Sequence, residues 1–229
     1  MKLSIIVPVY NEEKTIKKVL EKLANLDAGV GKEIIVIDDG STDGTCEILR
    51  KFQIPNSKFQ IIFQEKNQGK GAAVRRGFQE ADGDILIIQD ADLEYNPEEY
   101  EKLIKPIIAG ETKVVCGSRF LQENPNLYRR YLWGNKFLSF LISFLYRVKI
   151  TDAYTGYKVM SKEIYKNLNL KSNGFEFEAE ITCEFLKKGY KILEIPISYN
   201  PRSIKEGKKI NYKDAIYGIW TIIKLQCKV

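Results

Sequence analysis

The sequence predicts an α/β fold: a mostly parallel sheet with helices on both faces, followed by further helices. Two observations predict it. Short runs rich in isoleucine and valine alternate with helical patterns along the first half of the chain, and three of these runs end in acidic and polar clusters. Such alternation is typical of parallel sheets covered on both faces. With 229 residues, 44% of them hydrophobic, the chain can bury one large core.

The first half supplies most of the expected elements. Five apolar runs predict strands at residues 3–9, 34–37, 59–63, 85–88 and 114–116. The segments between them predict helices at residues 12–26, 43–52, 71–81 and 97–109. Asn96 and Pro97 support the last helix, because asparagine caps helix N-termini and proline suits the first helical position. We therefore expect an α/β half that ends near Phe120.

The pattern changes after Phe120. An aromatic segment predicts a helix at residues 128–148, and a glycine-containing turn follows at residues 154–156. The remaining chain predicts a helix at residues 178–188, a strand at residues 191–199 and an amphipathic helix at residues 212–225. We therefore divide one continuous domain into an α/β half, residues 1–120, and a second half, residues 121–229, which carries the C-terminal helices.

Composition excludes several kinds of site. Histidine is absent, which removes Ser–His nucleophile pairs, imidazole bases and histidine-containing zinc sites. The four cysteines lie far apart and Met1 runs directly into a strand, so we expect reduced thiols and a cytosolic protein. The net charge of +6 comes from scattered basic residues, so nucleic acid is not an expected partner. Acid–base or metal chemistry must then rest on carboxylates.

Three polar clusters stand where expected strands end. They are Tyr10-Asn11-Glu12-Glu13, Asp38-Asp39-Gly40-Ser41 and Asp90-Ala91-Asp92. Open α/β sheets bind ligands at the carboxyl ends of their strands, so we expect the three clusters to form one pocket. Carboxylate oxygens suit Mg²⁺ or Mn²⁺, and such a cation bridges to phosphate. The sequence thus predicts a divalent cation and a phosphorylated ligand at this edge.

The aspartate pairs also have an ordinary structural interpretation as helix caps or solvated turns. Thr42 or Asp43 would cap the helix that follows the second strand. A cap explains one of these residues but leaves the acid pair at the strand end unexplained. This favours a contact from Asp39 to a nucleotide base or ribose.

Gly69-Lys70-Gly71 imitates a dinucleotide-binding fingerprint, because it opens a helix after the third strand. We reject that interpretation, since the fingerprint belongs in the first strand-to-helix turn, where Glu12 and Glu13 would repel a pyrophosphate. Two interpretations of Lys70 stay open: a contact to a nucleotide phosphate, and a plain helix start.

Taken in order, the motifs resemble family 2 glycosyltransferases with the GT-A (Rossmann-like) fold. The matching segments of the first half are Pro8-Val9-Tyr10-Asn11-Glu12, Asp38-Asp39-Gly40-Ser41, Gly69-Lys70-Gly71, Asp90-Ala91-Asp92 and Gly117-Ser118-Arg119-Phe120. The second half resembles the polyprenyl-phosphate branch, which includes dolichyl-phosphate mannose synthases. Its matching segments are Thr151-Asp152 through Gly156-Tyr157, Gly174-Phe175-Glu176-Phe177, Glu194-Ile195-Pro196-Ile197 through Arg202, and Gly207-Lys208.

The resemblance implies a nucleotide-sugar donor bound by residues 1–120 and an acceptor bound by residues 121–229. It assigns donor contacts to the residues of the strand-end clusters and the third turn: Pro8, Val9, Tyr10, Glu12, Asp39, Lys70, Asp90 and Ala91. It assigns catalysis to Asp90, Asp92, Arg202 and Lys208. It assigns Mg²⁺ or Mn²⁺ to Asp90, Asp92 and Glu94. The family typically has glutamine where Glu94 stands, and the added charge bears on metal preference or donor choice.

The acceptor implied by the resemblance is a polyprenyl (dolichyl or undecaprenyl) phosphate. Arg119, Arg129 and Arg130 are the candidates for its phosphate, because arginine makes bidentate contacts to phosphate oxygens. Their alternative is a pairing with surface acids. Trp133 stands where the family's Arg-Arg-x-x-Ser segment has its serine. The expected reaction is metal-dependent, inverting transfer from GDP-mannose, UDP-glucose or UDP-N-acetylglucosamine. An acceptor phosphate is already anionic, so no strong base is needed.

The aromatic helix bears on where the protein works. Residues 137–145 contain two polar residues in nine and have basic flanks, but a bilayer span needs about 20 apolar residues. Such a helix suits the membrane interface, and residues 216–224 are a second candidate. A buried core or dimer helix is the alternative. We expect a cytoplasmic protein, peripherally associated with the inner membrane face, and the resemblance allows for a separate membrane-anchor subunit.

Two rival functions stay open. A GT-A enzyme with a saccharide acceptor would need a base, which Glu176, Glu178 or Glu180 could supply. A non-catalytic membrane-surface protein could also reuse the fold, because fold alone never proves function. The intact pair of Asp90 and Asp92 argues against the second rival.

Overall fold

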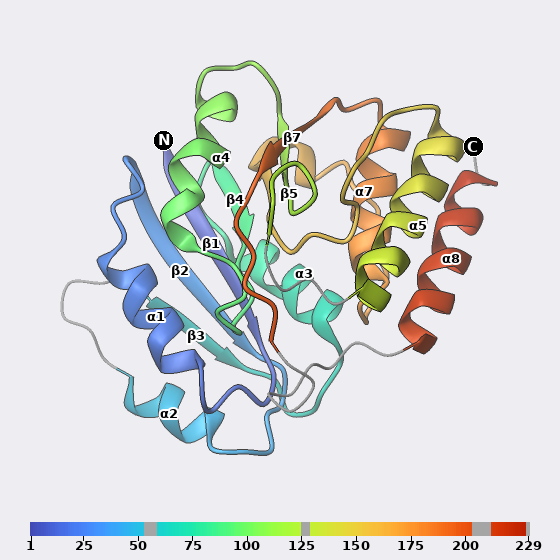
Figure 1. Ribbon diagram of the computed structural model, residues 1–229. Helices are drawn as coiled ribbons and strands as arrows, with labels where there is room; N and C mark the ends of the chain where they lie inside the picture. Colours follow the sequence, from blue (N-terminus) through green and yellow to red (C-terminus); the bar gives the residue numbers. More distant parts are fainter. Residues whose placement is uncertain (53–58, 125–128, 203–211, 228–229) are drawn as a thin grey trace.

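The computed structural model describes residues 1–52, 59–124, 129–202 and 212–227. In these parts the chain forms one seven-stranded sheet with helices on both faces, so the predicted fold class is confirmed (Figure 1). The strands are β1 (Lys2–Val9), β2 (Gly31–Asp38), β3 (Phe59–Phe63), β4 (Ile85–Ile88), β5 (Val114–Ser118), β6 (Lys158–Ser161) and β7 (Ile192–Pro196).

The helices alternate with these strands in the first half and cluster in the second. They are α1 (Ile16–Asn25), α2 (Thr45–Lys51), α3 (Lys70–Glu80), the short 3₁₀ helix η1 (Pro97–Glu99), α4 (Tyr100–Ile108), α5 (Arg129–Tyr146), α6 (Lys162–Tyr165), α7 (Phe177–Lys187) and α8 (Tyr212–Gln226). Asn96 caps η1 as predicted, since its side chain accepts from the Glu98 N–H. Among the helices within the described ranges, none is both long and apolar enough to cross a bilayer.

The strand order is β3-β2-β1-β4-β6-β5-β7. All neighbouring pairs are parallel except those of β6, which runs antiparallel to both β4 and β5. The second half of the chain therefore contributes two strands to the sheet of the first half. Because β1 lies between β2 and β4, the carboxyl ends of these three strands are adjacent.

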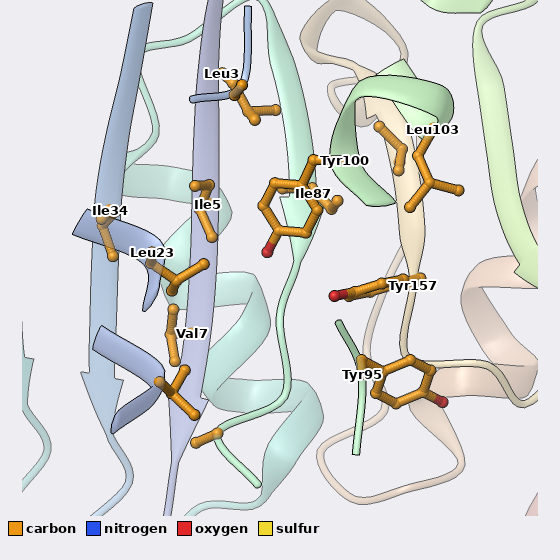
Figure 2. Packing of buried hydrophobic residues seen from close by; sticks show 14 of the residues in the cluster. Leu3, Ile5, Val7, Leu23, Ile34, Ile87, Tyr95, Tyr100, Leu103 and Tyr157 are labelled. Atoms are coloured by element: carbon orange, nitrogen blue, oxygen red, sulfur yellow. The ribbon is translucent and has the colours of Figure 1, made fainter. Parts of the chain in front are cut away.

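The sheet is buried on both faces because its central strands carry apolar residues at successive positions. Ile5 and Ile6 are both fully buried, but they belong to different clusters on opposite faces. The Ile5 cluster packs against α1 and α4 (Figures 1 and 2). The Ile6 cluster packs against α3 and α7. Burial of each such side chain stabilises the fold by roughly 1.5–3 kcal/mol.

A third apolar cluster joins α5, α7 and α8 beside the sheet (Figure 1). Leu138 and Ile142 of α5 pack with Ile222 of α8 and with Ala179 of α7. The alternative that the aromatic helix is a core helix is therefore correct for one of its faces. Its other face is exposed, as described below.

The structure differs from the sequence prediction at three places. The strand β6 and the helix α6 were not predicted, because a four-residue strand that includes a lysine shows no period-2 pattern. Helix α1 begins at Ile16 rather than at residue 12, since residues 12–15 form a turn in which the Glu12 carbonyl accepts from Thr15 and Ile16. The strand predicted at residues 191–199 ends at Pro196, and Tyr199 continues it as an isolated bridge to Tyr95.

Candidate functional site

The carboxyl ends of β2, β1 and β4 hold the three predicted polar clusters at one edge of the sheet. The Asp39 N–H donates to the Val9 carbonyl (2.8 Å), and the Gln89 N–H donates to the Ile6 carbonyl (2.9 Å). These cross-strand bonds extend the parallel pairing just past the strand ends. The clusters that follow the strands therefore begin from neighbouring backbone positions, as the sequence predicted.

Asp39 fixes the loop that opens α3. Its carboxylate is buried and accepts the N–H groups of Gln68 and Gly69, each at 2.8 Å. Burial raises the pKa of Asp39, and the two backbone bonds partly offset that rise. Gly69 has φ +100°, and a Cβ there would collide with the Asn173 carbonyl. The role of Asp39 in binding a base or ribose stays a prediction.

Asp90 is the last of four alternating charges that extend into the second half of the protein. Lys70, the first residue of α3, places Nζ 2.6 Å from Asp90 Oδ1 and 2.8 Å from Glu178 Oε1. Lys158, on β6, donates from Nζ to Glu178 Oε2 at 2.5 Å. Lys158 also donates to two backbone carbonyls and is fully buried. These ion pairs join Lys158, Glu178, Lys70 and Asp90 in that order. They thus link β6 and α7 to the strand-end cluster.

The alternation of positive and negative charge stabilises these four side chains inside the fold. Burial alone would raise the pKa of Glu178, but Lys158 and Lys70 outweigh burial and lower it to about 2. Burial would lower the pKa of Lys70, but Asp90 and Glu178 raise it above its ordinary value. Glu178 and Lys70 are therefore charged at neutral pH, and each depends on its neighbours for charge compensation.

Gln89, the residue before Asp90, is held in place by two tyrosines from other parts of the chain. Gln89 Oε1 accepts from Tyr100 Oη (2.6 Å) and Tyr157 Oη (2.9 Å), and Gln89 Nε2 donates to the Asp90 carbonyl (2.9 Å). Figure 2 shows Tyr100 and Tyr157 among the buried side chains of the core. Gly156 lies against the Asp90 carboxylate so closely that a Cβ there would collide with Oδ2. The predicted glycine turn therefore belongs to this site.

Asp92 lies opposite Arg202, which comes from the segment after β7. Arg202 Nη2 donates to Asp92 Oδ2 (3.0 Å), and its two Nη atoms donate to the Glu12 carboxylate at 2.9 and 3.2 Å. Burial, together with the charges of Asp90 and Glu94, raises the pKa of Asp92 to about 7, although Arg202 acts against this rise. One guanidinium therefore serves two carboxylates from different strand ends.

Glu94 turns toward the same segment. Its Oε2 accepts from Tyr199 Oη (2.5 Å), and its Oε1 accepts from the Arg202 backbone N–H (2.7 Å). The Glu94 carbonyl also accepts from the Asn200 N–H (2.9 Å). Both carboxylate oxygens of Glu94 thus have partners in residues 199–202.

The donor set at this edge fits a hard divalent cation. Asp90 and Asp92 supply carboxylate oxygens only, and the raised pKa of Asp92 reflects burial first and then repulsion from Asp90 and Glu94, which a cation would offset. In the described part of the chain, no three acidic or cysteine side chains are arranged as a complete metal cluster. Two carboxylates are nevertheless enough for Mg²⁺, which completes its coordination with water and substrate phosphate.

Arg119 is buried and paired. Its Nε and Nη2 donate to the two oxygens of Asp152, each at 2.7 Å, and Nη2 also donates to the Tyr154 carbonyl. The guanidinium stacks over the Tyr199 ring at 5.0 Å. The structure thus gives Arg119 the pairing with an acid that the sequence offered as the alternative, but the acid is buried. Its role as a phosphate ligand stays a prediction.

The other predicted site residues are placed as follows. Pro8 and Val9 are the last two residues of β1 and are buried, and Tyr10, which follows them, is half-buried. The Ala91 carbonyl accepts from Thr15 Oγ1 (2.8 Å). The side chains of Arg129 and Arg130, and the whole of Lys208, lie outside the described residues.

The three glutamates considered as bases each have a structural partner. Glu180 is buried and accepts the N–H groups of Lys171 and Ser172, and Glu176 accepts the Gly174 N–H. Glu178 is held between two lysines, and its low pKa makes it a poor proton acceptor. No observation at these residues favours the rival with a saccharide acceptor.

Sequence reasoning missed Lys158, Gln89 and the pairing of Glu178. One signal was available for Lys158, which stands beside Tyr157, Val159 and Met160 in an otherwise apolar run. A lysine in such a run needs a buried partner. The partner itself, 20 residues further on, has no signature in the sequence.

Two neighbouring helices expose apolar side chains on their outer faces. On α5 these are Trp133, Phe137, Phe140 and Phe144, at 53–71% exposure. On α8 they are Ile216, Tyr217, Trp220 and Ile223, at 42–64% exposure. Within each helix the spacing follows i, i+4 and i+7, so each set forms a stripe along the helix. The stripes leave apolar side chains of both helices uncovered in the described part of the fold.

Comparison with known proteins gives a consistent result. The family model described as glycosyl transferase family 2 matches residues 4–168. The dolichol-phosphate mannosyltransferase of Pyrococcus furiosus is 34% identical over 216 residues, which cover 91% of this chain and 59% of that protein. The UDP-N-acetylglucosamine–dolichyl-phosphate N-acetylglucosaminyltransferase of Methanococcus voltae is 31% identical, with 90% and 89% covered. The chain spans roughly half to two thirds of the length of the first curated relatives it matches.

Solved structures show the same fold. Glucosyl-3-phosphoglycerate synthase from Mycobacterium tuberculosis, in complex with Mn²⁺, UDP and phosphoglyceric acid, superposes with a TM-score of 0.75 at 22% identity. The match covers 98% of this chain and 78% of that one. At this identity the likeness shows a shared fold.

Proposed function

The chain belongs to glycosyl transferase family 2, and from that premise we propose that it transfers a sugar from a nucleotide-diphospho-sugar to a polyprenyl phosphate. The donor is GDP-mannose, UDP-glucose or UDP-N-acetylglucosamine. The names of the Pyrococcus and Methanococcus relatives both mention dolichol (dolichyl) phosphate, which supports this acceptor class. The observation in the molecule that carries the lipid part of the proposal is the pair of exposed apolar stripes on α5 and α8.

The α/β half, residues 1–120, holds the donor in this proposal. Its contacts come from the ends of β1, β2 and β4 and from the start of α3: Pro8, Val9, Tyr10, Glu12, Asp39, Lys70, Asp90 and Ala91. The adjacency of these strand ends supports the assignment, because ligands of open α/β sheets bind there. Lys70 also begins a helix, where a backbone N-terminus and an ammonium both favour phosphate.

Mg²⁺ or Mn²⁺ would be held by Asp90 and Asp92. Glu94 is the third carboxylate that the sequence analysis assigned to the metal. The Mn²⁺ in the Mycobacterium structure supports a divalent cation in this fold. When bound, such a cation neutralises charge that develops on the departing diphosphate. The carboxylates of this chain would orient it at the sheet edge, beside the donor phosphates.

The remaining charge on the leaving group is assigned to the basic side chains Arg202 and Lys208. Arg202 supports this role through its place beside Asp92, at 3.0 Å. Preorganised donors of this kind are usually the largest electrostatic contribution to catalysis. An acceptor phosphate oxygen is an anion at neutral pH, so it attacks the anomeric carbon in line without a base. In-line attack inverts the configuration at that carbon.

The second half, residues 121–229, is assigned to the acceptor. Arg119, Arg129 and Arg130 are proposed to bind its phosphate. The exposed stripes of α5 and α8 would lie in the membrane interface, where the acceptor's hydrocarbon chain is. Exposed basic residues Lys136, Arg147 and Lys149 lie on and just after α5, and they would favour the anionic inner face of a cytoplasmic membrane. An anchor subunit would add to this attachment but is not required by it.

The test is transfer of radiolabelled sugar from each nucleotide sugar to a short polyprenyl phosphate, with Mn²⁺ or Mg²⁺ and with EDTA. We expect lipid-extractable label that is lost on chelation and in Asp92→Asn. The matched control is Asp82→Asn, an exposed aspartate away from the strand ends. Metal-dependent nucleotide binding without any lipid product would replace the lipid acceptor by a saccharide. Absence of nucleotide binding would favour the non-catalytic rival.

A further inference from the structure

The carboxylate of Glu94 is directed at the segment that carries Arg202. Tyr199 Oη lies 2.5 Å from Oε2 and the Arg202 N–H donates to Oε1 at 2.7 Å, so each oxygen has its own donor. Glu94 as a whole is also 9% exposed. Further contacts hold the segment at Glu94 against residues 199–202. Tyr95 and Tyr199 form an antiparallel bridge, and the centroids of their rings lie 5.2 Å apart.

The aspartate two residues earlier differs from Glu94 in what it contacts. Asp92 Oδ2 meets the guanidinium of Arg202, whereas Glu94 meets the backbone N–H of that residue. The two carboxylates therefore act on two parts of one residue. Glu94 fixes where the backbone of Arg202 lies, and Asp92 and Glu12 receive the side chain that this backbone position delivers.

We propose that Glu94 is a positioning residue that holds residues 199–202 so that Arg202 reaches Asp92. Because Arg202 is assigned to the donor diphosphate, this role of Glu94 rests on the proposed function. Glu94 holds the segment through two bonds, one from the Tyr199 hydroxyl and one from the Arg202 N–H. Loss of either bond leaves a buried donor without its acceptor, which is costly.

The choice of glutamate also follows from these partners. Two donors approach the two oxygens separately, and the Arg202 Nε lies 4.0 Å from Oε1, so a negative charge adds attraction. Glutamine can keep most of this arrangement, because its oxygen can accept from the Arg202 N–H and its amide can donate to the Tyr199 hydroxyl. Alanine can keep neither bond. The two substitutions therefore separate positioning from loss of the side chain.

The experiment compares Glu94→Ala, Glu94→Gln and Tyr199→Phe with Glu98→Ala, an exposed glutamate four residues further on. Binding of Mn²⁺ is measured by electron paramagnetic resonance in the presence of saturating UDP or GDP. Hydrogen exchange of the Arg202 amide is measured on the same proteins. Donor KM and kcat are measured in the sugar-transfer assay.

Positioning predicts that any fall in Mn²⁺ affinity in Glu94→Ala is accompanied by faster Arg202 exchange, because loss of a contact that orients a metal ligand typically costs about 10–100-fold. The Arg202 amide should exchange about fivefold faster, as expected for one lost hydrogen bond. The kcat should fall about tenfold with donor KM little changed, since a group that acts in the transition state is displaced. Glu94→Gln should recover most of both losses, and Glu98→Ala should match the wild type.

The opposite pattern overturns the proposal. A drop of about tenfold or more in Mn²⁺ affinity for Glu94→Ala, with unchanged Arg202 exchange, would make Glu94 a metal ligand. If Glu94→Ala does not fold, Tyr199→Phe decides, because it keeps the carboxylate: faster Arg202 exchange together with a reduced kcat supports positioning, and wild-type exchange and kinetics contradict it. The exchange measurement needs no activity. An inactive wild type would therefore overturn the proposed function, while Arg202 exchange would still show whether Glu94 holds the segment.

Discussion

Lys70 Nζ lies 2.6 Å from Oδ1 of Asp90, so the first aspartate of Asp90-Ala91-Asp92 is ion-paired with the first residue of α3. The same ammonium contacts Glu178 of α7. A change of charge at Asp90 therefore acts on Lys70 of α3 and, through it, on Glu178 of α7. The strand-end cluster is thus coupled electrostatically to the half of the chain that we assign to the acceptor.

Glu178 is expected to be indispensable for stability. Its removal in Glu178→Leu leaves Lys158 and Lys70 buried without their shared carboxylate, so unfolding free energy should fall by about 3–5 kcal/mol. Urea unfolding measures this change. The control Glu163→Leu removes an exposed partner of Lys113 and should cost under about 1 kcal/mol. Adding Lys158→Met to Glu178→Leu should restore part of the loss, and strict additivity would contradict the charge chain.

The same carboxylate predicts a pH dependence of stability. The pKa of Glu178 is lowered from 4.5 to about 2 in the folded state, so its contribution is complete above pH 4.5. As pH falls from 4.5 toward 2, the unfolded state takes up the proton first, and up to about 3 kcal/mol is lost. Unfolding free energies at pH 5 and pH 3 should therefore differ less in Glu178→Gln than in the wild type. Equal slopes would show that folding does not lower the pKa of Glu178.

Arg119 should be needed for folding as well as for any acceptor contact. The Arg119→Lys substitution loses the bidentate bond to Asp152 and should destabilise by about 2–4 kcal/mol, because a buried carboxylate loses part of its compensation. Thermal unfolding measures it, with Arg76→Lys, a partly exposed i,i+4 pair, as the control. Asp152→Asn should show a similar loss. A stable Asp152→Asn would assign the charge of Arg119 to a ligand instead.

The exposed stripes should decide membrane binding. Phe140→Ser and Trp220→Ser remove side chains that are each 64% exposed, so stability should change little. Sedimentation with vesicles that contain anionic lipid should show roughly 10- to 100-fold weaker binding per substitution, from about 1.5–3 kcal/mol of lost apolar burial. Leu121→Ser, at 45% exposure off the two helices, is the control. Unchanged binding would remove α5 and α8 from the membrane contact.

The sequence was sufficient for the parts of this protein that depend on local pattern. Successive apolar residues such as Ile5 and Ile6 predict a strand buried on both faces, and alternation with helices predicts a parallel sheet. Once that sheet is predicted, Tyr10, Asp39 and Asp90 must meet at one edge, since each follows a strand of it. The order of these motifs was also enough to identify the family.

Only the tertiary structure decided which charges meet. Lys158 pairs with Glu178, Arg119 with Asp152, and Arg202 with Asp92, which stands 110 residues earlier. Any of the 30 acidic residues could in principle pair with any of the 36 basic ones, so the sequence cannot rank these pairs. What ranks them is burial, because a charge removed from water must find its partner within contact distance. That distance is fixed by the sheet order, in which β6 inserts antiparallel between β4 and β5 and brings Lys158 beneath α7.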